Sequence, residues 1–188
     1  HANISVYNQL WGMNGIDQLS YNDFNKFMSG KQASVSFSIS NHNEYINGRT
    51  TPKDLETMMQ ILYAGIVKPR NDKEGFDVVK QMMIGALKNQ INSPNYVFQD
   101  SLTRFIYNNN PKAAIMSPEL IEKMDYARTL QIHNERFGNA AEFDFIIIGN
   151  FDEAQLKQYI AQYIASLPAK KAKKEVAVND KLDIKKGD

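Results

Sequence analysis

The sequence contains no cysteine, which excludes disulfide bonds, thiolate metal sites and cysteine nucleophiles. It also has no apolar run near the roughly 20 residues that a membrane-spanning helix needs, so no membrane span is predicted. No Gly-x-Ser-x-Gly or Gly-x-Gly-x-x-Gly motif occurs. The sequence therefore indicates neither the nucleophile turn of a hydrolase nor a dinucleotide-binding turn.

Histidine is scarce, with three in the chain. His1 is the first residue, and we expect it to be left over from a tag. His42 falls in a predicted turn and His133 near the end of a predicted helix, and neither has a second histidine four residues away, the spacing with which one helical face binds zinc. We expect no metal ligand, no cofactor-binding residue and no catalytic residue in this chain. We expect a solvated His42, and a His133 whose charged form is favoured by the helix dipole.

Most of the chain also lacks a strong excess of positive or negative charge. The formal net charge is +1, but residues 169–188 hold seven lysines against four acidic residues, which leaves about −2 on the remainder. A body without a basic face predicts no nucleic-acid partner. We interpret residues 1–168 as a single domain and residues 169–188 as a Lys-rich linker or tail. Because the first residue is not Met, we expect the chain to be a piece of a longer protein.

The hydrophobic pattern predicts helices interleaved with strands. Three helix starts, at Thr51, Ser93 and Ser117, place a hydroxyl at the N-cap and proline at the first helical position. Helices are expected over 3–13, 20–30, 52–67, 72–89, 94–107, 118–137 and 153–167, and strands over 33–40, 44–48 and 143–148. The predicted fold class is α/β in the layered α+β sense, with a small, mostly antiparallel sheet packed by several helices on one side.

One βα unit near the end of the chain carries the most specific pattern. Residues 143–148 are almost continuously apolar and rich in β-branched side chains, which predicts a strand covered on both faces. Asp152 and Gln155 form a capping-box pattern, so a helix is expected to begin at Glu153. Its apolar residues recur at three- and four-residue steps and predict one buried stripe: Leu156, Tyr159, Ile160, Tyr163, Ile164 and Leu167.

Small polar side chains alternate with apolar ones in the first predicted strand. The four serines of this strand are candidate peptide-binding residues, because an edge or face with small polar residues can receive an extended peptide by strand addition: Ser34, Ser36, Ser38 and Ser40. An ordinary solvated face is the alternative interpretation.

Residues 136–152, which read Arg-Phe-Gly-Asn-Ala-Ala-Glu-Phe-Asp-Phe-Ile-Ile-Ile-Gly-Asn-Phe-Asp, and the Ser-Leu-Pro at 166–168 carry a resemblance to a known family. They resemble the closing strand and helix of one repeat of the insulinase-like (M16) zinc metallopeptidases, most closely the long bacterial zinc proteases. Upstream, the Leu19-Ser20-Tyr21 helix start, the alternating strand, the hairpin and the Pro52 helix follow the same order. The resemblance covers residues 3–168 and implies one metallopeptidase-like repeat domain whose first strands are missing.

Active repeats of this family carry His-x-x-Glu-His on the first helix, where the histidines hold zinc and the glutamate activates a water molecule. The matching positions here read Val6-Tyr7-Asn8-Gln9-Leu10. The family's third ligand is a later glutamate, and this sequence has no acidic residue between Asp77 and Asp100. The resemblance therefore implies a non-catalytic repeat, with zinc and catalysis in a sister domain of the same polypeptide.

The implied role is to close the chamber of a peptidase and to help bind its peptide substrate, in a bacterial periplasm or cell envelope. A catalytically dead scaffold or peptide-binding module is the alternative, and an unrelated α/β module without any peptidase connection is a third interpretation. For the chain in isolation, unpaired strand edges predict a homodimer or poor solubility.

Overall fold

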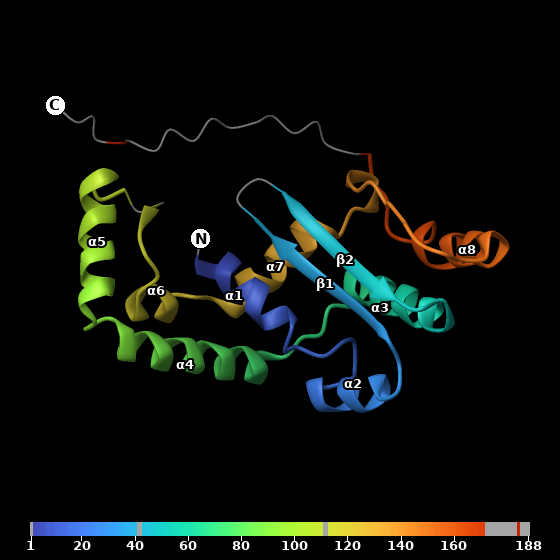
Figure 1. Ribbon diagram of the computed structural model, residues 1–188, viewed down its shortest axis with the longest axis horizontal. Helices are drawn as coiled ribbons and strands as arrows, with labels where there is room; N and C mark the ends of the chain where they lie inside the picture. Colours follow the sequence, from blue (N-terminus) through green and yellow to red (C-terminus); the bar gives the residue numbers. More distant parts are fainter. Residues whose placement is uncertain (1, 41–42, 111–112, 172–183, 185–188) are drawn as a thin grey trace.

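The computed structural model describes residues 2–40, 43–110, 113–171 and 184 (Figure 1). It is an elongated α+β domain, with α5 at one end and α8 at the other (Figure 1). In chain order the elements are α1 Ala2–Trp11, α2 Tyr21–Met28, β1 Ala33–Ile39, β2 Glu44–Thr50, the 3-10 turn η1 Pro52–Asp54, α3 Leu55–Val67, α4 Lys73–Gln90, α5 Pro94–Ile106, α6 Pro118–Glu122, α7 Tyr126–Phe137, the 3-10 turn η3 Ala140–Glu142, α8 Glu153–Tyr159 and the π-helical turn η4 Ile160–Ile164.

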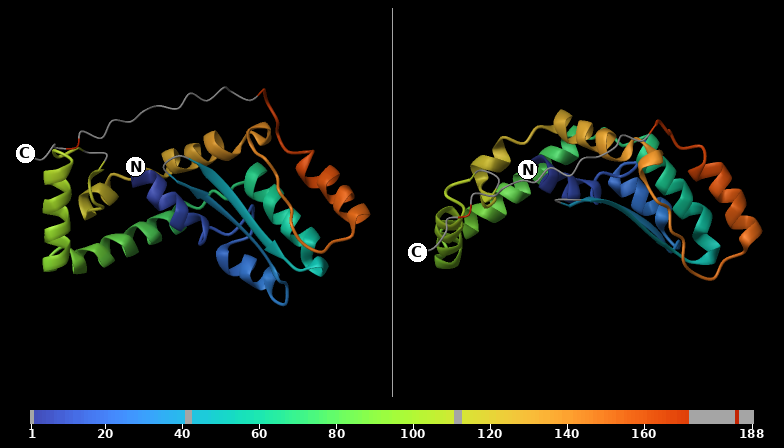
Figure 2. Two further views of the ribbon diagram at one scale, coloured as in Figure 1. Left: turned by 45° about the horizontal axis from the view of Figure 1, so that its top comes forward. Right: turned by 90° about the horizontal axis from the view of Figure 1, so that it is seen from above.

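The strands β1 and β2 form an antiparallel hairpin whose register runs from Ala33 opposite Thr50 to Ile39 opposite Glu44. Helices α1, α3 and α7 lie on one side of this hairpin, as the view from above shows (Figure 2). Phe37 and Ile39 are buried toward the helices, whereas Ser34 and Ser36 are exposed. The predicted layered α+β class, with a small antiparallel sheet packed by helices on one side, is confirmed.

Two hydrophobic clusters make up the core, and α1 joins them. Tyr7 belongs to the larger cluster, which packs β1 against α1, α3, α7 and α8, while Val6 belongs to the smaller one, beside Phe76 and Ile121. Adjacent residues of α1 therefore face the two clusters. α1 is also in direct contact with α4, the helix that carries Phe76 of the smaller cluster.

Local capping largely follows the predicted pattern. The side chains of Ser20, Ser93, Ser117 and Asp152 each accept a hydrogen bond from the backbone N–H three residues later. The prediction for Thr51 was wrong. Its hydroxyl lies 3.2 Å from a carboxylate oxygen of Asp54, to which it donates, and makes no bond to a helical N–H.

The prediction of one helix over 118–137 was also wrong, because the chain leaves the helix between α6 and α7. Asp125 accepts a hydrogen bond from the Arg128 N–H at 2.6 Å and starts a second helix. The interruption lets Met124, which is 4% exposed, turn into the smaller cluster.

The expected strand at 143–148 is not paired. Residues 143–148 are extended, but the described sheet holds only β1 and β2. The expectation that this segment is covered on both faces was wrong, because Ile146 is 81% and Ile148 91% exposed. Among the described residues, no strand lies beside the segment to carry side chains over it.

Across the part of the chain described here, none of the helices combines the length and apolar character needed to cross a lipid bilayer.

Candidate functional site

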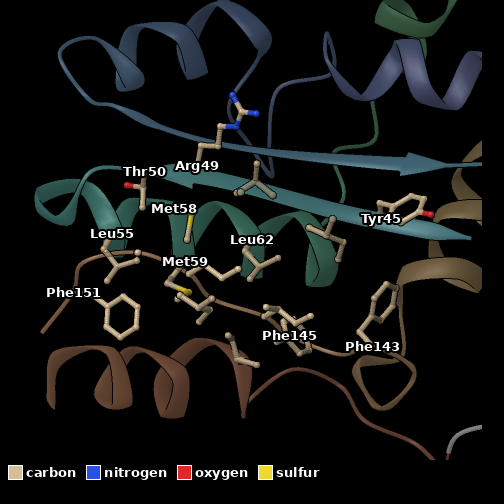
Figure 3. Close-up of a pocket in the computed structure, with 18 of the residues that line it drawn as sticks. Tyr45, Arg49, Thr50, Leu55, Met58, Met59, Leu62, Phe143, Phe145 and Phe151 are labelled. Atoms are coloured by element: carbon tan, nitrogen blue, oxygen red, sulfur yellow. The ribbon is translucent and has the colours of Figure 1, made fainter. Parts of the chain in front are cut away.

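A groove of about 720 Å³ separates β2 from the extended segment 143–151 (Figure 3). Its lining includes Leu55, Met58, Met59 and Leu62 of α3, whose side chains are drawn between β2 and the segment (Figure 3). The volume lies within the range of about 300–1,000 Å³ that is common for ligand sites. The groove is concave, and much of its lining is apolar.

The edge of β2 that faces the groove is defined by the hydrogen-bond pattern of the hairpin. The Ser40 N–H donates to the Asn43 carbonyl at 2.8 Å, and the Thr51 N–H donates to the Gln32 carbonyl at 3.1 Å. In an antiparallel ladder such bonded pairs alternate with pairs whose backbone groups point outward. The outward set of β2 is therefore Glu44, Ile46, Gly48 and Thr50, and all four residues line the groove.

The outer edge of β1 supports this assignment. The same alternation turns the Ile39 backbone away from β2, and the side chain of Asn8 in α1 bonds both of its groups. The Ile39 N–H donates to Asn8 Oδ1 at 2.9 Å, and Asn8 Nδ2 donates to the Ile39 carbonyl at 3.0 Å. α1 therefore occupies the outer edge of β1 at this point.

The opposite wall of the groove is the segment 143–151. Phe143 and Ile147 pack on the larger cluster, and the Phe143 N–H donates to the Ala140 carbonyl. Within the described residues, the backbone groups of 144–148 make no hydrogen bond of their own. The segment is therefore an extended chain with unpaired backbone and large apolar side chains in solvent.

Helix α8 and the turn η4 hold this wall in place. Asp152 caps α8 through the Gln155 N–H at 2.7 Å, as the sequence predicts. The Tyr163 hydroxyl donates to Glu56 of α3 at 2.9 Å. Members of the predicted apolar stripe pack on the larger cluster, so the expected buried face of this helix is confirmed. Both walls of the groove are therefore held in place by contacts with α3.

Two of the positions where the family resemblance places the zinc motif, both in α1, carry core side chains. Val6 and Tyr7 are fully buried, and the Tyr7 ring stacks 5.6 Å from Trp11 and 5.9 Å from Phe137. Apolar and aromatic groups do not fit a zinc ion, which needs imidazole, thiolate or carboxylate ligands. No group of three or more His, Cys, Asp and Glu side chains in the described part of the chain is arranged to hold a metal ion.

His133 lies inside this aromatic cluster, 4.2 Å from the Trp11 ring and nearly parallel to it. Its Nδ1 is 3.0 Å from the Tyr7 hydroxyl, and its Nε2 has no hydrogen-bond partner among the described residues. Burial lowers the pKa of His133 to about 4, an effect that the Gly65 backbone opposes only in part. Burial also raises the pKa of the Tyr7 hydroxyl. The expectation of a charged helix-end histidine was wrong, because the ring is buried and neutral.

The candidate serines lie on the other face of the hairpin from the groove. Ser34, Ser36 and Ser40 are exposed and Ser38 is half-buried. Ser40 donates through its hydroxyl to the Asn43 carbonyl at 2.9 Å. None of the four lines the groove. Peptide binding by this face stays a prediction, and His42 lies outside the described residues.

Sequence reasoning did not single out the groove. Met59 is buried at 1% exposure, whereas its neighbour Met58 is only partly buried, and both line the groove. The signal that could have indicated the groove is the continuous apolar run at 143–148, which requires cover that the other described strands do not provide.

No protein-family model matches the sequence, and no curated protein matches it. Solved structures do match. The ferredoxin protease FusC, a mutant in complex with Arabidopsis ferredoxin, aligns with a TM-score of 0.70 at 16% identity over 89% of this chain. The periplasmic protease PqqL from Escherichia coli gives 0.73 at 18% identity over 92%, and a protease from Helicobacter pylori gives 0.64 at 9% identity over 97%.

The chain has the fold of one part of each of these proteases, as expected for an insulinase-like (M16-type) repeat domain. This confirms the fold that the sequence resemblance implied. The chain spans 18% of the FusC chain, 19% of the PqqL chain and 45% of the Helicobacter pylori protease chain. The domain therefore corresponds to a part of each of these larger proteins.

Proposed function

We propose that this chain is a non-catalytic domain of a zinc-dependent M16-type peptidase. It closes the chamber and helps to bind the peptide substrate, while a sister domain of the same polypeptide holds zinc and carries out catalysis. The observation that carries the proposal is a protease-like fold in which no position of the expected zinc motif, Val6 to Leu10, carries a histidine or a glutamate. Val6 and Tyr7 are fully buried there, and Asn8 bonds the edge of β1.

Burial of Val6 and Tyr7 supports the assignment of catalysis elsewhere. A histidine in place of Val6 would sit inside the smaller cluster beside Phe76 and Ile121, where burying a polar or charged group is costly. Reintroducing histidines at Val6 and Leu10 and a glutamate at Gln9 is therefore expected to destabilise the domain without creating a peptidase.

The neighbour PqqL is described as a periplasmic protease. By this likeness we propose the bacterial periplasm or cell envelope as the location of the parent protein.

The decisive experiment compares the protein at its natural length with this 188-residue chain at equal concentration, using a quenched fluorescent peptide. We expect the natural-length protein to cleave the peptide, a chelator to stop cleavage and added zinc to restore it, and the 188-residue chain to be inactive throughout. Metal analysis of both proteins should find zinc only in the longer one.

Absence of both cleavage and zinc in the natural-length protein would refute the proposal and favour the alternative, a catalytically dead scaffold or peptide-binding module. Cleavage by the 188-residue chain itself would refute the non-catalytic assignment.

The serine face can be tested in the same assay. If it binds substrate, Ser36→Asp and Ser38→Asp should raise KM for an uncharged peptide with little change in kcat. Asn47→Asp, on the same exposed face of β2, adds the same charge next to the serines and serves as a control for general electrostatic effects. An unchanged KM in both serine variants would leave these residues as solvated surface.

A further inference from the structure

The dipeptide Asn-Gly occurs twice in the chain, at Asn14-Gly15 and at Asn47-Gly48. In this dipeptide the backbone nitrogen of the glycine can attack the side-chain amide carbon of the asparagine, because glycine has no side chain to hinder the approach. The new bond closes a five-membered succinimide ring. The attacking nitrogen gives its proton to solvent, and the side-chain nitrogen takes up a proton and leaves as ammonia. Water then opens the ring to aspartate or isoaspartate.

The groups that react are accessible at Asn47-Gly48 in β2. Both residues are exposed. The side-chain amide of Asn47 has no hydrogen-bond partner among the described residues, and the Ser36 hydroxyl approaches the backbone carbonyl of Asn47 instead, at 3.5 Å. The register pairs the backbone of Asn47 with Ser36, whereas the N–H of Gly48 belongs to the outward set of β2. Solvent can therefore reach both the amide carbon and the nitrogen that attacks it.

Asn14-Gly15 is enclosed by the fold. Asn14 is 2% exposed, and its Nδ2 donates to the Arg70 carbonyl at 2.8 Å. Ring closure would have to break this hydrogen bond. Gly15 has a φ of +68°, and a Cβ placed on it would collide with the Leu19 carbonyl. The backbone rotation and the water molecule that the reaction needs are therefore excluded while this turn stays folded.

The two sites also differ in the unfolding that the reaction requires. Ring closure turns the asparagine ψ away from its folded value. At Asn47 this disrupts the backbone pairing with Ser36 in a sheet whose described part has two strands. At Asn14 it disrupts a buried contact between the end of α1 and Arg70. Local opening of an exposed strand costs much less free energy than opening a buried region.

We propose that Asn47 is a site of spontaneous deamidation in this chain, and that the fold protects Asn14 although it belongs to the same dipeptide. The reaction needs only this chain and water, so it is independent of the proposed function.

Deamidation changes the strand that borders the groove. Either product places a carboxylate beside Gly48, which lines the groove. Isoaspartate also routes the backbone through the former side chain and lengthens β2 by one atom. Gly48 and Arg49 then no longer match Val35 and Ser34 in the register of the hairpin. The isoaspartate form therefore has a weakened hairpin, whereas the aspartate form keeps the original backbone.

The test follows both sites in the 188-residue chain during incubation in mildly alkaline buffer, with one sample folded and one in urea. Tryptic peptides 1–26 and 32–49 separate the two dipeptides, and fragmentation in the mass spectrometer locates the converted residue. Asn47→Gln is the matched control, because the longer side chain would have to close a six-membered ring, which forms much more slowly. Asn47→Asp supplies the standard for the aspartate product.

In urea we expect both sites to convert at similar rates. In the folded chain we expect Asn47 to convert at least about 10-fold faster than Asn14, since it requires only local opening. Isoelectric focusing of the folded chain should show acidic forms that accumulate with time, and most of these should be missing from Asn47→Gln.

Equal rates at the two sites in the folded chain, or faster conversion at Asn14, would overturn the proposal. An unconverted Asn47 in the folded chain, after the urea sample has largely reacted, would overturn it as well. The same accumulation of acidic forms in Asn47→Gln as in the wild type would assign the change to other residues and would also refute it.

Discussion

Gly65 and Gly85 occupy the interiors of two helices and differ in what surrounds them. A Cβ on Gly65 in α3 would lie 2.6 Å from two ring carbons of Phe37 in β1, whereas a Cβ on Gly85 in α4 would meet nothing within 4 Å. The Phe37 ring also contacts Trp11 at 4.9 Å and Phe137 at 5.2 Å, measured between ring centroids. It therefore cannot turn away from Gly65 without disturbing the cluster.

The same substitution should therefore have opposite effects at the two sites. Alanine stabilises a helix interior relative to glycine by roughly 0.5–1 kcal/mol. Overpacking a core costs about 1–3 kcal/mol. We expect Gly85→Ala to raise the free energy of unfolding by up to about 1 kcal/mol, and Gly65→Ala to lower it by about 1–2 kcal/mol after the gain in helix propensity is included.

Urea unfolding followed by circular dichroism measures both changes, with equal m-values required for the comparison. Phe37→Leu in the Gly65→Ala background should recover part of the loss, since it shortens the ring that meets the new methyl group. A Gly65→Ala chain as stable as Gly85→Ala would refute the reasoning, because it would mean that β1 does not pack this closely on α3.

Two further predictions concern pH and association. His133 has a pKa of about 4 in the folded chain against an ordinary value of 6.5, so the unfolded state takes up the proton first. Stability should be fully present above pH 6.5 and should fall by about 3 kcal/mol as the pH decreases to 4, at about 1.4 kcal/mol per tenfold change in proton affinity. His133→Phe should remove this step in urea titrations at pH 7 and pH 4, and an unchanged pH dependence would contradict burial of a neutral ring. The isolated chain should self-associate through the uncovered apolar segment, and replacing Ile146 and Ile148 by glutamate should shift it toward the monomer in sedimentation velocity. A wild-type chain that stays monomeric at every accessible concentration would contradict that expectation.

Local patterns predicted much of the architecture because each depends on residues within one helical turn or one strand. The cap residues Ser20, Ser93, Ser117 and Asp152 each bond an N–H three residues away. The serine alternation likewise identified β1, since successive side chains of a strand point to opposite faces. The break between α6 and α7 carries the same kind of local signal, because Asp125 accepts a hydrogen bond from the Arg128 N–H.

Burial of α2 and α5 shows where local patterns stop being informative. Phe24, Phe27 and Met28 have helical spacing, yet no residue of α2 is buried, and Lys31 lies over the Phe27 ring at 3.9 Å. α5 buries none of its residues either, and Phe98 is 61% exposed. An apolar stripe indicates which face of a helix needs cover. It does not indicate whether the described chain supplies that cover.

The sequence by itself determined where the helices begin, the two-residue periodicity of the hairpin and the absence of zinc-binding side chains from the first helix. Only the tertiary structure decided that His133 is buried and neutral, that β2 and residues 143–148 stand apart, and that a groove lies between them. The physical reason is the separation, along the sequence, of the residues that interact. Capping and side-chain alternation depend on contacts between near neighbours in the chain, whereas burial, pKa and the pairing of a strand edge depend on which distant residues lie beside it.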